Sequence, residues 1–255
     1  MKDFTLDKYR QVLSAIKGLS IPVHGVADWI RCQPKDGILL RHDVDRRDHC
    51  ALAMARAEKD YDIHSTYYFR CRADGFQRRI IEQIAGWGHE IGYHYEELAV
   101  AQGDMPRAWA MFQEHLERLR AIVPVDTIAM HGSPLSPHDN RALFRHHDLT
   151  ELGLLGDAYL TLDYSGCFYF SDTGRTWHAT PLNFRDQPMR CRLAAVSSTD
   201  ELVHFIRHHH NERIALLSHP ERWPNSVAGY IVSWISDKTA NGIKRMILMR
   251  QAHLS

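Results

Sequence analysis

Short apolar segments alternate with amphipathic segments along most of this chain, and no other feature of the sequence constrains the fold as strongly. Strand-like runs lie at 38–40, 65–69, 90–93, 127–130 and 214–217, and helical periodicity runs through 6–17, 48–59, 76–87, 104–123 and 199–210. Strands that alternate with helices in this way form parallel pairs with crossover helices. The sequence therefore predicts an α/β protein, with either an open doubly wound sheet or a closed barrel.

The length of the chain fits one large domain. It has 255 residues, of which 44% are hydrophobic, and α/β barrels occur as single domains of about 250 residues. No internal repeat or linker divides it, and 149–191 is expected to be irregular with β pieces. We therefore expect a single domain over 1–255.

The charge balance and the cysteines limit the class of protein. Lys and Arg total 31, as do Asp and Glu, so nothing indicates a nucleic-acid or membrane-surface partner. No segment approaches the ~20 apolar residues of a membrane span. Five scattered Cys residues indicate free thiols in a reducing compartment. Together with the absence of an apolar signal-peptide core at the N-terminus, they predict a cytoplasmic protein.

Polar residues follow each predicted strand. They are Asp43 and Asp45 after 38–40, Arg70 after 65–69, and one His after each of the next three runs: His94, His131 and His219. The carboxyl ends of parallel strands lie on one face, where active sites assemble. Convergence there of carboxylates and imidazoles indicates a hydrolytic metal site with a spare acid and base.

Four motifs carry a family resemblance: Leu-Arg-His-Asp-Val-Asp ending at Asp45, Gly-His-Glu-Ile-Gly-Tyr-His ending at His94, His-Gly-Ser-Pro from His131, and His-Pro-Glu-Arg-Trp from His219. Across 38–223 the chain resembles a divergent branch of the polysaccharide deacetylases, the chitooligosaccharide deacetylase homology domain of carbohydrate esterases. The resemblance implies a distorted (β/α) barrel of about seven parallel strands in one domain. It also implies removal of N- or O-acetyl groups from sugars, with Zn²⁺, or else Co, Mn or Ni, held by one Asp and two His.

The resemblance also assigns roles. Asp43 would be the general base, Asp45 and His94 metal ligands, and His219 the general acid. Asp172 is our candidate for the carboxylate that keeps His219 cationic.

Further residues are expected to contact the substrate. They are Gly132 and Ser133, through a backbone N–H beside the oxyanion, together with Arg70 and Trp223. Either Arg70 or Arg41 would steady the base.

One position departs from the family pattern. The second His ligand usually stands four residues after the first, where this chain has Leu98. Leu cannot bind a metal, so the third ligand must come from elsewhere. We expect it to be His131, which follows the next predicted strand, with Glu97 as the alternative.

A cytoplasmic deacetylase would act on a nucleotide sugar or a lipid-linked glycan intermediate of surface-polysaccharide synthesis, such as lipopolysaccharide O-antigen. Two other metal hydrolases stay open, a phosphoesterase and a cyclic amidohydrolase. A phosphoesterase needs cations around its site, and Arg41, Arg46, Arg47 and Arg70 keep that interpretation open. A catalytically silent sugar-binding protein is a further alternative, motivated by Leu98. A glycosyltransferase that uses Asp-Val-Asp is another, but it leaves the His residues unexplained.

The C-terminal segment has an apolar stripe at helical spacing. It consists of Val227, Tyr230, Ile231, Trp234 and Ile235. We expect this stripe to pack against the core, with a partner or membrane helix as the alternative.

Overall fold

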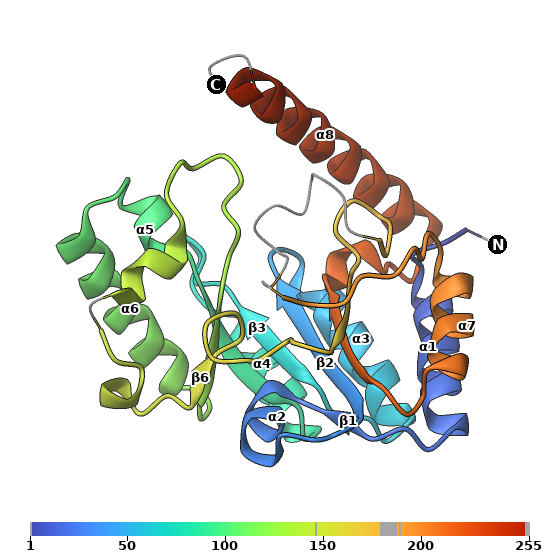
Figure 1. The fold of residues 1–255 in the computed structure, drawn as a ribbon. Coiled ribbons are helices and arrows are strands. Elements are labelled where there is room, and N and C mark those ends of the chain that lie inside the picture. Colours follow the sequence, from blue (N-terminus) through green and yellow to red (C-terminus); the bar gives the residue numbers. More distant parts are fainter. Residues whose placement is uncertain (1, 146, 179–187, 189, 253–255) are drawn as a thin grey trace.

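The computed structural model describes residues 2–145, 147–178, 188 and 190–252. Within them, seven parallel strands curl into a half-barrel in the order β6-β5-β4-β3-β2-β8-β7, and a short β1 pairs with β2 (Figure 1). The strands are β1 (Val23–His24), β2 (Gly37–Val44), β3 (Thr66–Phe69), β4 (Glu90–Tyr95), β5 (Thr127–Met130), β6 (Gly156–Asp157), β7 (Phe168–Ser171) and β8 (Arg213–Ser218). The prediction of a single-domain distorted α/β barrel is confirmed.

Helices surround the sheet, with α5 and α6 on one side of the view and α1 and α7 on the other (Figure 1). The helices are α1 (Leu6–Gly18), α2 (Val26–Cys32), α3 (Asp48–Asp60), α4 (Arg78–Gly86), α5 (Glu97–Val100), α6 (Met105–Arg120), α7 (Thr199–His208) and α8 (Val227–Ala252). Local sequence explains several helix starts, since side-chain oxygens of Thr5, Asp104 and Ser198 accept backbone N–H groups of the first turns of α1, α6 and α7.

Burial of β2 and β8 fixes their register, and the register decides which residues lie side by side at the carboxyl ends of the two strands. All eight residues of β2 are buried, as are five of the six in β8. A strand covered on both faces is held firmly in register, and β2 pairs with β8 so that His42 lies opposite Ser218. The residues just beyond this pair, Asp43 and His219, therefore emerge next to each other at the carboxyl rim.

The irregular region predicted at 149–191 contains β6 and β7, and the 3₁₀ helix η2 (Thr150–Leu152). Residues 179–187 and 189 of that region lie outside the described residues. Two short helices were not predicted, namely α2 and α5. No helix in the described part of the chain is long and apolar enough to cross a membrane.

The prediction that the stripe on α8 packs against the core is wrong. Four of its five side chains are exposed, with exposed fractions of 49% at Ile231 and 44% at Trp234, and Tyr230 is partly buried. The polar side of α8 faces the body instead: Ser233 Oγ donates to the carbonyl of Glu221 at 2.7 Å, and Asp237 accepts from Arg175 at 2.6 Å. Hydrogen bonds and ion pairs therefore orient this helix, and its apolar side is left outward.

Candidate metal centre

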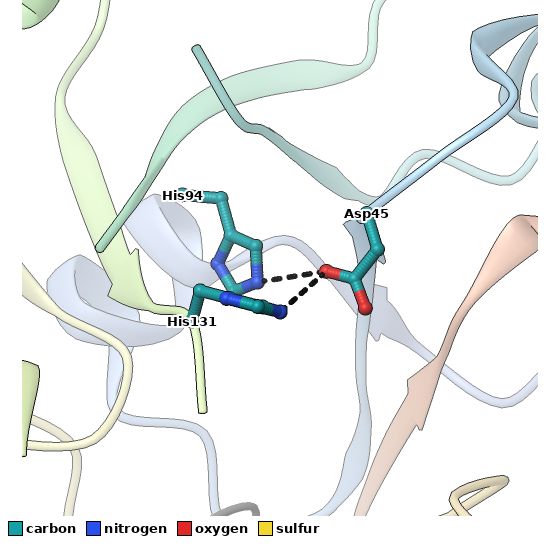
Figure 2. A group of neighbouring side chains, drawn as sticks. All are labelled: Asp45, His94 and His131. Carbon is teal, nitrogen blue, oxygen red and sulfur yellow. Dashed lines mark ion pairs between the residues drawn. The ribbon is translucent and has the colours of Figure 1, made fainter. Parts of the chain in front are cut away.

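Asp45, His94 and His131 meet at the carboxyl rim of the sheet (Figure 2). His94 belongs to β4, His131 follows β5, and Asp45 follows β2. The Nε2 atom of His94 lies 3.3 Å from Asp45 Oδ1, and that of His131 lies 3.5 Å from the same oxygen. One ligand atom from each of the three residues lies within 4.8 Å of the others, which is the spacing of side chains around a shared ion.

The second nitrogen of each imidazole fixes its orientation. His94 Nδ1 is 3.0 Å from the carbonyl oxygen of Ala129, and His131 Nδ1 is 2.8 Å from Glu96 Oε2. Both partners accept hydrogen bonds, so Nδ1 carries the proton in each ring. The Nε2 lone pairs therefore point toward Asp45, as they do in metal sites where an outer oxygen holds the ligating His.

The charges at this cluster fit a cation. Asp45 Oδ1 is buried and receives no hydrogen bond from the described residues, although it faces two imidazoles. Burial lowers the pKa of His94, but the carboxylates of Asp43 and Asp45 outweigh that effect and raise it. Positive charge is thus favoured here, and two nitrogens with one carboxylate are a donor set that suits Zn²⁺ or a similar divalent ion.

Glu97, the alternative third ligand, lies elsewhere. Its side chain is buried, accepts a hydrogen bond from the hydroxyl of Tyr93 and lies 2.8 Å from His115 Nδ1. Leu98, which stands where the resemblance would place a second His ligand, is buried in the core next to it. His131 is therefore the residue that faces Asp45 and His94 from the third direction.

Asp43 lies beside the cluster and next to a buried cation. Its Oδ2 is 3.9 Å from His94 Nε2 and 3.6 Å from an Nη of Arg41, while Oδ1 has no hydrogen bond within the described part of the chain. The Arg41 guanidinium is buried 4.3 Å from the ring centroid of Tyr159. Arg70 instead binds Glu96, so of the two arginines considered for steadying Asp43, Arg41 is the one that contacts it.

His219 is held by Asp172, which follows β7. His219 Nδ1 lies 2.7 Å from Asp172 Oδ1, and its backbone N–H donates to Oδ2 at 2.9 Å. Arg222 and Trp223 also donate to this carboxylate, at 2.7 and 2.8 Å. Burial lowers the pKa of His219, and so does Arg222, but the Asp172 carboxylate outweighs both and the result is about 9. His219 is therefore protonated at neutral pH.

The remaining predicted site residues occupy different surroundings. Trp223 is 1% exposed and packs against Phe4 and Trp177, so it offers no surface to a ligand and instead supports Asp172. Ser133 lies at the rim with its Oγ 3.1 Å from His131 Nδ1, and Gly132 links the two residues along the chain.

Sequence reasoning missed three charged residues around the site. Glu96 holds both His131 and Arg70, Arg222 binds Asp172, and Glu221 is buried nearby. The last two belong to the His-Pro-Glu-Arg-Trp motif, whose interior was not interpreted. Glu96 carried no signal of its own, because its role depends on how β4 and β5 pair.

Comparison with family models finds no match, and a search of curated proteins finds no similar sequence. Solved structures do resemble the chain. A family 4 carbohydrate esterase (CE4) pseudoenzyme from Bacillus anthracis is 13% identical over 80% of this chain, with a TM-score of 0.44. A family 4 carbohydrate esterase from Bacillus anthracis is 14% identical over 84% of this chain and 78% of its own length, with a TM-score of 0.39.

A peptidoglycan deacetylase from Bacillus subtilis is 11% identical over 83% of this chain and 97% of its own, with a TM-score of 0.39. The chain spans only 61% of the length of the pseudoenzyme. At such low identities and TM-scores, the likeness supports no conclusion about activity. The proposed function must therefore rest on the side chains of this chain.

Proposed function

We propose that the protein is a metal-dependent deacetylase that hydrolyses an acetyl group on a sugar, and a divergent relative of the polysaccharide deacetylases. The observation that carries this proposal is the convergence of Asp45, His94 and His131, with both imidazole lone pairs turned toward the carboxylate. Asp43 and His219 flank that cluster, so a base and an acid accompany the candidate metal site.

Asp45, His94 and His131 would hold the ion. A divalent ion supplies two things when bound: a more acidic water and polarisation of the acetyl carbonyl. Three protein ligands leave room for both groups, as in catalytic zinc sites. We favour Zn²⁺ among the candidate metals because two imidazoles and one carboxylate match its preferences.

Asp43 takes the proton of the attacking water. It is buried beside His94, its Oδ1 receives no hydrogen bond from the described residues, and the Arg41 guanidinium lies 3.6 Å from its Oδ2. His219 gives a proton to the departing sugar atom, since it is cationic at neutral pH. Asp172 holds the ring in place and stabilises its charge. A backbone N–H near Gly132 or Ser133 is proposed to stabilise the oxyanion.

The substrate is proposed to be a cytoplasmic acetylated sugar, either a nucleotide sugar or a lipid-linked glycan intermediate. The phosphoesterase alternative requires free cations around the metal. Two of the arginines that motivated it are engaged: Arg70 binds Glu96, and Arg41 lies buried beside Asp43. The deacetylase therefore fits the charges of the rim better.

Replacing Asp43 tests the proposal. The Asp43→Asn variant should retain metal, because Asp43 is not among the three ligands, while turnover of acetyl-chitooligomers falls by about 100- to 10,000-fold through loss of the base. Metal content by elemental analysis and acetate release would be measured on the same preparations. Full activity of the variant would remove Asp43 from this role, and phosphate-ester hydrolysis without acetate release by the wild type would favour the phosphoesterase.

A further inference from the structure

Glu221 is a buried carboxylate without a hydrogen-bond donor. It lies in the 3₁₀ helix η4 (Pro220–Arg222), between His219 and Arg222, and is 2% exposed. Neither side-chain oxygen receives a hydrogen bond from the described residues. Its backbone carbonyl is held by Ser233 of α8, so its position is fixed. The side chain is thus placed firmly and yet left unsatisfied.

The charges around Glu221 belong to the proposed catalytic site. Burial raises its pKa, and the negative charge of Asp45 raises it further, to about 7, although His219 and Arg222 oppose this. Arg46 lies 3.7 Å away, with about half of its side chain exposed and a hydrogen bond to α8. Glu221 therefore lies two residues from the proposed acid and next to Arg46, the residue that follows Asp45, with Arg46 toward the solvent.

A buried carboxylate without hydrogen-bond donors is unfavourable, because it has lost its hydration and gained no hydrogen bond in return. Arg46 is too distant to donate a normal hydrogen bond. A ligand that brings a donor to Glu221 would therefore be favoured. The atom of the substrate nearest to His219 is the one that receives its proton, and this atom is a nitrogen in an acetamide and an oxygen in an acetate ester.

We propose that Glu221 accepts a hydrogen bond from the N–H of the leaving nitrogen and thereby makes the site selective for N-acetyl over O-acetyl sugars. This inference rests on the proposed deacetylase function. In the reaction, the bond between the acetyl carbon and nitrogen breaks, and a bond to the water oxygen forms. Nitrogen gains one proton, and the products are an amine and acetate. An ester oxygen has no hydrogen to offer, so Glu221 would stay unsatisfied beside it.

The experiment compares two substrates that differ in the leaving atom: the N-acetylglucosamine trimer and 2-O-acetyl cellotriose. Glu221→Gln should lower kcat/KM for the amide by about 10- to 100-fold, the value of one hydrogen bond to a charged group, and change it by less than about 3-fold for the ester. Glu82→Gln is the matched control, since Glu82 is an exposed carboxylate on α4. Metal content should be the same in all three proteins, and the melting temperature of Glu221→Gln should not fall below that of the wild type, because the substitution removes an unfavourable buried charge.

Equal losses on both substrates would show a general effect on the metal or the acid and would overturn the proposal. Unchanged activity on the amide, or a wild type that prefers the ester, would overturn it as well. If the metal-loaded wild type hydrolyses neither substrate, the proposed function fails. The role of Glu221 as a hydrogen-bond acceptor is then tested separately, by measuring sugar affinities with calorimetry. Wild type should then bind the N-acetylglucosamine trimer more tightly than cellotriose, and Glu221→Gln should lose that preference. Equal binding by wild type would contradict the inference.

Discussion

Two imidazoles face one carboxylate at the rim because each ring is tied at its other nitrogen. The backbone carbonyl of Ala129 holds His94, and the carboxylate of Glu96 holds His131. These contacts place the proton on Nδ1 of each ring and turn the Nε2 lone pair toward Asp45 in the absence of a ligand. Glu96 is itself held by a hydrogen bond from Arg70. Arg70 therefore supports the residue that orients His131.

This arrangement predicts which substitutions weaken metal binding. His131→Ala removes a ligand and should raise the Kd for Zn²⁺ by more than about 100-fold, while Glu96→Gln disturbs only the support of His131 and should raise it by about 10- to 100-fold. Glu97→Gln should leave it unchanged, because Glu97 binds Tyr93 and His115. Competition with a chromophoric chelator measures all three. Weaker binding by Glu97→Gln than by His131→Ala would reverse the assignment of the third ligand.

The proposed acid, His219, predicts the alkaline side of the pH profile. Its pKa is raised to about 9, and an acid can act only when it is protonated. Therefore kcat/KM should fall as pH rises through about 9. Asp172→Asn removes the charge that raises this pKa, so the fall should move to lower pH. A profile measured on both proteins over pH 6–10 tests this. If the alkaline fall occurs at the same pH in the variant, it does not arise from the titration of His219.

At the scale of elements, the strands of the sheet were predictable and the contacts of α8 were not. The apolar runs that became β2, β3, β4, β5 and β8 are short and bounded by turns, so their positions follow from the sequence, although β2 continues to Val44, beyond the predicted run at 38–40. The stripe on α8 has the same apolar character, but a sequence does not say which side of a helix finds a partner. There, Asp237 binding Arg175 and Arg222 decided the orientation.

The exposure of the apolar stripe on α8 can be tested by measuring how much a substitution in it changes the free energy of unfolding. Trp234→Ser should change the free energy of unfolding by no more than about 0.5 kcal/mol, because the side chain is already 44% exposed. Trp29→Ser, at a Trp that is 3% exposed, serves as the buried control and should cost about 3–5 kcal/mol. Denaturant titrations give both values. A cost at Trp234 as large as at Trp29 would mean that the stripe is buried in solution.

At the scale of the whole molecule, the sequence predicted the members of the site better than their supports. Asp43, Asp45, His94, His131 and His219 were identifiable because each lies at or just beyond a strand end, and parallel strands bring those ends together. Glu96 and Arg41 were not assignable, since their partners come from neighbouring strands and from the chain between β5 and β7. Such contacts depend on register and loop course, which local patterns do not encode.

We propose that one divalent ion binds between three strands of the half-barrel. Anomalous scattering from a crystal grown with Zn²⁺, recorded on both sides of the zinc absorption edge, locates such an ion. We expect a single strong peak within about 2.0–2.2 Å of Asp45, His94 Nε2 and His131 Nε2. A fully loaded protein whose zinc lies away from these three side chains, or is held by Glu97, would contradict it.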